Sequence, residues 1–442
     1  MKDKIRIGCG AGFSGDRIEP AVVLAERVEL DYLVLECLAE RTIALAQKRK
    51  LEDPSLGYDL LLERRIGTLL PHLIRNNARL ITNMGAANPL EGAKKIVEIA
   101  RKQNQKIKVA AVTGDNVLAS IQQNASAIKD LEYGKSLNEY AIVSANAYLG
   151  ADAIVEALKT NAEIIITGRV ADPSLFLAPM IHEFDWDKND YNLLGKGTVT
   201  GHLLECAGQV TGGYFADGVH KKVDNLDNLG HPFADVYPDG SSIISKADGT
   251  GGVVNLQTVK EQLLYEVMNP HEYVTPDVVS DFTTVYLKET GKDKVHVTGG
   301  AGKKKPATYK TSIGYKAFYL GEGEISYAGA AAYERAQLAN DILQKRLQYF
   351  SSDLRIDLIG VQSMHKTSFD HLQKPYEIRL RVAAKAKTAA DAALIGEEVE
   401  ALYTNGPAGG GGARKYVTEV IGIVSTLIDR NTISPQVTLF ES

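Results

Sequence analysis

A glycine run near the start of the chain has the spacing of a phosphate-binding loop. Gly10-Ala11-Gly12-Phe13-Ser14-Gly15 directly follows the apolar run Ile5–Cys9. In dinucleotide-binding proteins such glycines let the backbone approach a pyrophosphate, and an acidic residue roughly 20 positions later binds the ribose. Glu36 stands at that place. The run therefore predicts a dinucleotide site, unless its neighbours contradict that use.

Two neighbours do argue against a pyrophosphate. Asp16 places a carboxylate where the phosphates would approach, and Pro20, a favoured first-turn residue, moves the expected helix start beyond Glu19. We therefore interpret the loop as one wall of a small-molecule cleft. Its predicted substrate-binding residues are Gly10, Gly12, Gly15 and Arg17, with Asp16 as a candidate acid or base.

Four further apolar runs also end in small and polar residues. Ligands of open parallel sheets bind beyond the carboxyl ends of the strands, so these loops should meet at one edge. Arginine suits bidentate binding of a carboxylate, which makes Arg169 the predicted anion ligand. An ordinary ion pair with Asp172 is the alternative. The other candidates on these loops are Asn83, Gly85, Asn88, Asp172 and Ser174 for binding, and Glu36 and Asp115 for acid–base chemistry.

A candidate proton-transfer pair lies further along the chain. His202 and Glu205 are three residues apart, which places them on one face of a helix. Histidine titrates near neutral pH and glutamate is a natural orienting partner, although a structural histidine is the commoner case. Cys206 is a weaker candidate nucleophile because nothing nearby activates it. No histidines have His-x-x-x-His spacing, so we expect no dedicated metal site, while a magnesium ion at Asp115 or Asp172 stays open.

Four consecutive glycines, Gly409–Gly412, precede Arg414 and Lys415. Ordering such a run costs much conformational entropy. Gly410 and Gly411 are therefore candidate substrate contacts in an anion-binding nest or a lid. A flexible connection is the alternative.

The elements that must position these residues form two patterns. Up to about residue 180, buried-strand runs alternate with amphipathic helices; the runs are Ile5–Cys9, Tyr32–Leu35, Leu80–Thr82, Val109–Val112 and Ile164–Thr167. This alternation predicts an α/β fold with a doubly wound, mostly parallel sheet over residues 1–280, with a glycine-rich elaboration from about 185. Residues 281–442 predict an α+β domain with an antiparallel sheet and a split βαβ order, extended by strands around 283–297 and 311–319.

Composition limits the class of protein. The 442 residues carry a formal net charge of −5, with 44% hydrophobic residues and three cysteines. These values are typical of a globular cytoplasmic protein without a leader, and they argue against nucleic-acid and membrane partners. We expect a homo-oligomer, with a small partner subunit as a further possibility.

Several blocks together resemble the acyclic terpene utilisation family of bacterial proteins (AtuA-type). The blocks span nearly the whole chain and are 10–18, 36–42, 82–89, 167–174, 201–206, 321–327 and 405–412. The resemblance implies a link to breakdown of branched acids and terpenoid acyl-CoA esters. It implies no particular catalytic residue.

These observations favour a catabolic enzyme that acts on a small carboxylate or its CoA ester by hydration, elimination or carbon–carbon lysis. Arg169 would bind the carboxylate, backbone amides of the Gly10–Gly15 and Gly85 loops would hold an oxyanion, and His202 with Glu205 would move the proton. No cofactor is assigned beyond CoA as part of a substrate. The alternatives are an NAD(P)-dependent oxidoreductase and a non-catalytic subunit that docks a partner enzyme through its C-terminal sheet.

Overall fold

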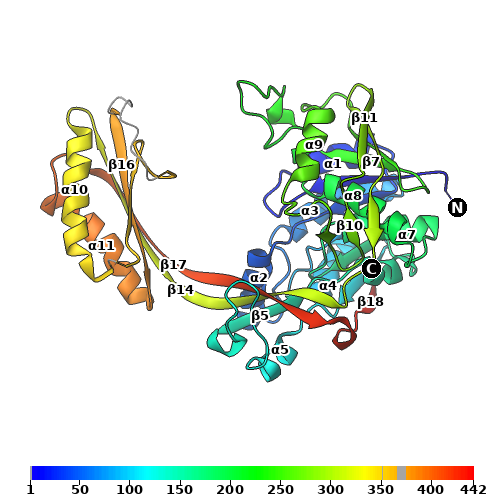
Figure 1. Ribbon diagram of the computed structural model, residues 1–442, viewed down its shortest axis with the longest axis horizontal. Helices are drawn as coiled ribbons and strands as arrows, with labels where there is room; N and C mark the ends of the chain where they lie inside the picture. The colour runs from blue at the N-terminus through cyan, green and yellow to red at the C-terminus, as the bar shows by residue number, and fades with distance from the viewer. Residues whose placement is uncertain (1, 351, 366–374) are drawn as a thin grey trace. The chain divides into compact units, whose positions relative to one another are not determined.

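The computed structural model describes residues 2–350, 352–365 and 375–442 (Figure 1). The chain forms two compact units: one contains the residues up to Gly314 together with Ile423–Ser442, and the other contains Tyr315–Gly422. Within the described residues, no helix combines the length and apolar character that crossing a bilayer requires.

The first unit is built on a ten-stranded mixed sheet. Its five central strands are parallel and lie in the order β1 (Ile5–Ala11), β2 (Tyr32–Leu35), β3 (Arg79–Thr82), β6 (Ile164–Thr167) and β4 (Lys108–Thr113). Antiparallel strands continue both edges: β7 (Pro232–Val236), β8 (Ser242–Lys246), β12 (Lys294–Thr298) and β11 (Tyr286–Gly291) beside β1, and β18 (Gln436–Glu441) beside β4. The five predicted strands are confirmed, but the whole sheet is mixed.

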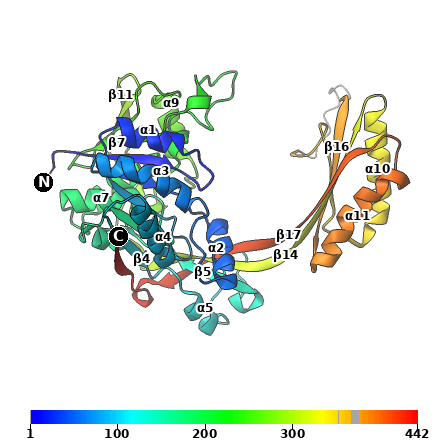
Figure 2. The same cartoon turned by 180° about the vertical axis from the view of Figure 1, so that it is seen from behind.

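Helices cover both faces of this sheet, which explains why its central strands are apolar throughout. One face packs against α1 (Glu19–Arg27), α3 (Leu62–Arg75) and α4 (Pro89–Lys102), which lie side by side in Figure 2. The other face packs against α6 (Ala151–Leu158), α7 (Ser174–Phe184) and α8 (Tyr191–Glu205). Ile5, Ile7 and Cys9 of β1 join the second core, whereas Ala11 joins the first, because the register of β1 shifts between Cys9 and Ala11.

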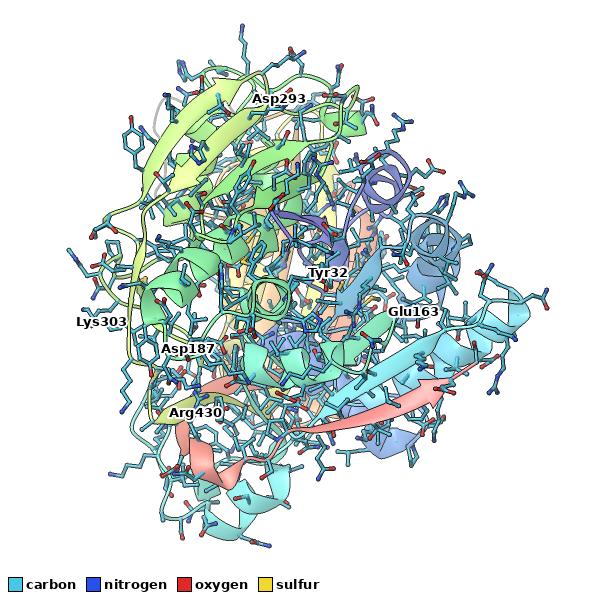
Figure 3. All side chains as sticks on the ribbon, turned by 90° about the vertical axis from the view of Figure 1, so that its right-hand side faces the viewer. Tyr32, Glu163, Asp187, Asp293, Lys303 and Arg430 are labelled. Carbon is cyan, nitrogen blue, oxygen red and sulfur yellow. The ribbon has the colours of Figure 1, made fainter. Side chains whose placement is uncertain are left out.

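The remaining elements of this unit pack either against α8 or around a further strand. They are α2 (Glu40–Glu52), α5 (Leu118–Asn124), β5 (Ile142–Ala147), α9 (Leu256–Leu264) and a small sheet of β13 (Ala301–Lys303), β10 (Val279–Asp281) and β9 (Tyr273–Val274). Figure 3 shows Tyr32 within the sheet and Asp293 at the turn between β11 and β12. The Tyr32 hydroxyl donates a hydrogen bond of 2.5 Å to Glu183 of α7.

The second unit is an antiparallel sheet with helices packed on one face. The strands lie in the order β15 (Arg355–Ile359), β16 (Glu377–Ala386), β14 (Thr308–Ala328) and β17 (Gly411–Asp429), and the helices are α10 (Ala332–Arg346) and α11 (Ala389–Asn405). The start of β14, up to Gly314, and the end of β17, from Ile423, belong to the first unit. Ile325 and Leu380 face the helices and are fully buried. On other positions of the sheet, Arg381 pairs with Glu322 and lies 3.1 Å from Asp357.

The units differ from the predicted division at residue 280. The strands in 283–297 do not extend the C-terminal sheet, because β12 pairs with β8 and β11 pairs with β12 in the first unit. The end of the chain also returns to the first unit, where β18 pairs with β4. The segment 311–319 does belong to β14. The finer classification as a doubly wound sheet followed by a split βαβ unit stays a prediction.

Candidate functional site

A cavity of about 970 Å³ lies beyond the carboxyl ends of β1, β2 and β6, entirely within the first unit. The strand-end loops and the end of α8 supply its walls. The predicted site residues that line it are Gly12, Asp16, Glu36, Arg169, Asp172 and Glu205. The structure thus brings together residues from four separate parts of the sequence.

The glycine loop is shaped by its own side chains. The Asp16 carboxylate accepts a hydrogen bond of 2.7 Å from the Gly12 amide, and α1 begins at Glu19, one residue before the start expected from Pro20. Arg65, which is 1% exposed, donates to the Ser14 and Asp16 carbonyls at 2.9 and 2.8 Å. The Gly12 amide, which a bound pyrophosphate would need as a hydrogen-bond donor, is therefore already bonded to a carboxylate of the protein. This argues against the dinucleotide interpretation.

Close packing explains the first two glycines of this run. A Cβ on Gly12 would lie 2.5 Å from the Cys206 carbonyl carbon, and one on Gly10 would lie 2.8 Å from the Ala21 Cβ. Gly15 lies beside the Phe13 ring and is exposed. Arg17 is exposed and donates to the Asp227 carbonyl at 2.9 Å. Gly10, Gly15 and Arg17 do not line the cavity.

Arg169 is the buried cation of the cavity, with a residue exposure of 2%. Its guanidinium donates to the Leu38 carbonyl, lies 3.2 Å from Asp172 Oδ1 and stacks 4.0 Å from the Tyr148 ring centroid. Its backbone amide donates to Asp115 at 2.9 Å. Most of its binding capacity is used within the protein, and Nε is the group left without a hydrogen-bond partner among the described residues.

Three residues that the sequence did not single out lie beside Arg169 in the cavity wall: Tyr148, the acidic Glu40 and a second cation, Lys310. We call the part of the wall that holds Arg169 and Lys310 the cationic side. The Tyr148 hydroxyl donates to Glu40, and Lys310 Nζ lies 3.4 Å from Glu40 Oε1 and 4.9 Å from the Tyr148 ring centroid. Although desolvation opposes it, the charge of Arg169 with the Tyr148 hydroxyl and Lys310 lowers the pKa of Glu40 to about 2. The Lys310 side chain is 49% exposed, so its ammonium group is the more accessible cation.

Glu36 and Asp172 form the acidic side of the same wall. Glu36 Oε1 accepts hydrogen bonds of 2.8 Å from the Leu38 amide and from Asn83 Nδ2. Burial, and then the charge of Asp172, raise the pKa of Glu36 well above its ordinary value. Burial also raises the pKa of Asp172, against the opposing charge of Arg169. Two neighbouring carboxyl groups with raised pKa values favour a state in which they retain a proton.

Glu205 and His202 form the predicted pair, but the residue that lines the cavity is Glu205 and not His202. His202 Nδ1 lies 2.8 Å from Glu205 Oε1, and only Glu205 lines the cavity. His202 is 1% exposed and packs against the rings of Tyr273 and Phe282, at 5.1 and 5.4 Å between centroids. Burial raises the pKa of Glu205 to about 7, while His202 opposes the rise. Glu205 Oε2 has no hydrogen-bond partner among the described residues.

Several predicted site residues have structural contacts behind the cavity wall. Asp115 accepts from Asn146 Nδ2 at 2.9 Å as well as from Arg169, and burial raises its pKa. Asn83 donates to Glu36 and accepts from the Cys37 amide at 2.7 Å. They support lining residues without lining the cavity themselves.

The other predicted binding residues lie further away. A Cβ on Gly85 would lie 2.5 Å from the Thr167 carbonyl oxygen, and Ser174 donates to buried Asp277 at 2.5 Å. Asn88 donates to the Pro54 and Leu56 carbonyls at 2.9 and 2.7 Å. None of the three lines the cavity.

Gly410 and Gly411 belong to the second unit. Gly410 packs within that unit, where an added Cβ would lie 2.9 Å from Ile325 Cδ1 and 3.2 Å from the Tyr327 ring. The cavity is lined by residues of the first unit. The anion-nest interpretation of this run thus gains no support from these contacts.

Cysteine and metal chemistry receive little support at the cavity. Cys37 and Cys206 line it, but burial raises the pKa of both thiols, so the reactive thiolate is disfavoured. Across the described ranges, no group of three or more His, Cys, Asp and Glu side chains is arranged to hold a metal ion.

Sequence reasoning missed several lining residues: Glu40, Tyr148, His231, Tyr273 and Lys310. Glu40 lies in the 36–42 block, only four residues after Glu36, so a polar residue at the start of the following helix was the available signal. Lys310 and Tyr273 carry no such signal, because they reach the cavity from chain segments more than 60 residues beyond the last predicted pair.

A comparison with family models gives one match over nearly the full length. The model described as acyclic terpene utilisation family protein AtuA matches residues 5–439, which includes both units. No curated protein and no solved structure matched the chain. The match agrees with the resemblance of the sequence blocks, and the chain therefore belongs to the acyclic terpene utilisation family.

Proposed function

We propose that this protein is an enzyme that transfers a proton to or from a small carboxylate or its CoA ester, in a hydration, elimination or carbon–carbon lysis reaction. The observation that carries the proposal is Glu205, a buried residue of the cavity wall whose carboxyl has its pKa raised to about 7 by burial and whose Oε2 is unpartnered among the described residues. A general acid or base works best when its pKa is near the operating pH.

The roles within the predicted pair follow from burial. Glu205 exchanges the proton with the substrate, whereas His202 orients the Glu205 carboxyl through Nδ1. His202 is enclosed by Tyr273 and Phe282, so it has no path to a substrate except through Glu205. Glu36 and Asp172 are two further carboxyls of the cavity wall whose pKa values are raised by burial.

The substrate anion would bind on the cationic side of the cavity. Lys310 is the more accessible cation, and Arg169 adds a fixed buried charge held by Leu38, Asp172 and Tyr148. Charge that develops on a carboxylate or thioester oxygen would be stabilised by these cations. The Gly12 amide is engaged by Asp16, and Gly85 lies outside the cavity, so the predicted backbone oxyanion site has less support.

The two alternative functions have weaker support. An NAD(P)-dependent oxidoreductase requires the glycine loop to accept a pyrophosphate, which the Asp16–Gly12 hydrogen bond opposes. Millimolar NAD or NADP should therefore give no thermal protection, because a ligand that binds the native state must stabilise it. A purely docking role would leave the acid–base groups of the cavity without a use. The cytoplasmic location and the homo-oligomeric state stay predictions.

Solvent-proton exchange tests the proposal at the proton-transfer step itself, whichever bond is made or broken afterwards. The purified protein is incubated in D₂O with a panel of short-chain acyl-CoA esters, 3-hydroxyacyl-CoA esters and their free acids, and deuterium incorporation is followed by mass spectrometry. We expect incorporation with at least one class, and a loss of about 100-fold or more in Glu205→Gln. Glu52→Gln, on an exposed helix end, serves as the matched control. Absence of exchange across the panel, or equal exchange in both variants, would refute the proposal.

A further inference from the structure

A second histidine, His231, lies in the wall of the same cavity. It directly precedes β7 and is 4% exposed, yet it is one of the lining residues. Its imidazole lies next to Gly208, where an added Cβ would come within 3.6 Å of both Cδ2 and Nε2. Neither the sequence motifs nor the proton transfer by Glu205 uses this side chain.

The hydrogen bond of His231 fixes its tautomer. Nδ1 lies 3.2 Å from the Gly10 carbonyl oxygen. A carbonyl oxygen can only accept, so Nδ1 carries the hydrogen and Nε2 keeps its lone pair. Gly10 therefore contributes to the site through its carbonyl group on β1. The side chain presents one basic nitrogen that is not used by this contact.

The surroundings hold His231 in place and keep it neutral. The preceding Gly230 carbonyl accepts a hydrogen bond of 2.6 Å from the Thr211 hydroxyl. Burial lowers the pKa of His231, and the charge of Asp16 opposes this, while Arg65 and Arg17 add to it. A neutral imidazole with a fixed tautomer is the form that can take a proton at neutral pH.

We propose that His231 is a second catalytic residue of this cavity, acting as the base at Nε2 while Glu205 acts as the acid. The inference rests on the proposed function, since it assigns the partner group for the same reaction. Addition or elimination of water needs one group at the carbon that loses or gains a proton and another at the leaving oxygen. Glu205 is the last residue of α8, and Gly208, three residues later, lies beside the His231 imidazole; all three residues line the cavity.

The elimination step balances with these two groups. Nε2 of His231 takes the proton from the substrate carbon next to the carbonyl group, and the C–H electrons form the carbon–carbon double bond. The bond from the neighbouring carbon to its hydroxyl breaks, and the Glu205 carboxyl gives its proton to the departing oxygen, so that water leaves. The enzyme is left with an imidazolium and a carboxylate, and hydration is the reverse. Since the two proton transfers occur together, deuterium reaches the substrate carbon only when both groups act, through elimination and its reversal in D₂O.

Chemical labelling tests the open nitrogen independently of activity. Diethyl pyrocarbonate acylates accessible neutral imidazole nitrogens, and peptide mass spectrometry of the full chain locates the modified histidines. We expect His231 to react although it is only 4% exposed, because the residue lines the cavity and Nδ1, not Nε2, makes the hydrogen bond to Gly10. His271, whose side chain is 69% exposed, should react, and His202, sealed by aromatic rings, should not. An unmodified His231 beside a modified His271 would overturn the inference.

Variants separate this inference from the proposed function. In the D₂O exchange assay with 3-hydroxyacyl-CoA esters, we expect His231→Asn to lose about 100-fold or more, and His271→Asn to keep the activity of the native protein. Unchanged thermal unfolding of His231→Asn would show that the loss is not one of folding. If Glu205→Gln abolishes exchange and His231→Asn does not, this inference fails and the proposed function stands. If no member of the panel exchanges, the proposed function fails, and His231 loses its catalytic role with it.

Discussion

Glu205→Gln should change how the stability of the first unit depends on pH. Burial raises the pKa of this carboxyl from an ordinary value of 4.5 to about 7, so the folded protein holds the proton more tightly than the unfolded chain does. The folded state therefore loses stability as the pH rises from 4.5 to 7, and the full penalty applies above pH 7. A neutral amide removes this penalty.

The size of the effect follows from the same values. A rise from 4.5 to about 7 corresponds to roughly 3 kcal/mol, at 1.36 kcal/mol for each pH unit. About 2 kcal/mol of this destabilisation of the folded state develops between pH 5.5 and pH 8. The unfolding free energy of the variant, relative to the native protein, should thus increase by about 2 kcal/mol over this range. The introduced amide can still bond His202 Nδ1, which keeps the local packing similar.

The single tryptophan provides the assay. Trp186 is 6% exposed within the first unit, and its indole N–H donates to the Pro238 carbonyl at 3.0 Å. Urea unfolding of the native protein, Glu205→Gln and Glu52→Gln is followed by the Trp186 fluorescence at pH 5.5, 6.5, 7.5 and 8, which reports on the first unit. Glu52→Gln, a change from carboxylate to amide at an exposed residue outside the cavity, serves as the control. A Glu205→Gln difference that is constant with pH, or that decreases, would refute the burial argument.

Three further predictions concern the cationic side of the cavity and the glycine run. Arg169→Ala should lower the unfolding free energy by about 3 to 5 kcal/mol in the same fluorescence assay, because it leaves buried partners unpaired, and a loss below about 1 kcal/mol would contradict this. Tyr148→Phe removes the hydroxyl that donates to Glu40, so we expect a loss of about 1 kcal/mol at pH 7 that falls to roughly half or less at pH 2, where about half of the Glu40 carboxyls are protonated. Arg335→Ala should speed cleavage by a non-specific protease at 409–412, since this guanidinium donates to the Ala408 carbonyl beside the run; equal cleavage patterns would show that the run is held by other contacts.

The parallel core was predictable because its signal is local. Each central strand is a short apolar run bounded by turn residues, and burial on both faces removes the alternation seen elsewhere. Pro20 predicted the start of α1 to within one residue, at Glu19 rather than beyond it. The carboxyl ends of such strands meet at one edge, which is why Glu36, Arg169 and Asp172 were found together.

The domain division was less predictable because strand pairing is not local. The residues of β12 alternate in burial in a way that suits either sheet, and only hydrogen bonding to β8 assigns them to the first unit. The return of β18 to β4 joins residues more than 300 positions apart. Nothing in a run of strand-forming residues specifies a partner at that distance.

Contacts with residues distant in sequence also determine which of two neighbouring side chains can take part in the chemistry. The spacing of His202 and Glu205 is symmetrical, so it predicts their hydrogen bond but not which of them faces the cavity. That choice is made by Tyr273 and Phe282, which come from segments about 70 or more residues later and cover the imidazole. The glycine loop is a similar case, because Asp16 accepts a hydrogen bond from the Gly12 amide that a phosphate would otherwise bind. A motif thus locates the cavity, whereas the chemistry depends on what distant residues leave uncovered, and for this reason Glu205 and His231 are the residues to test first.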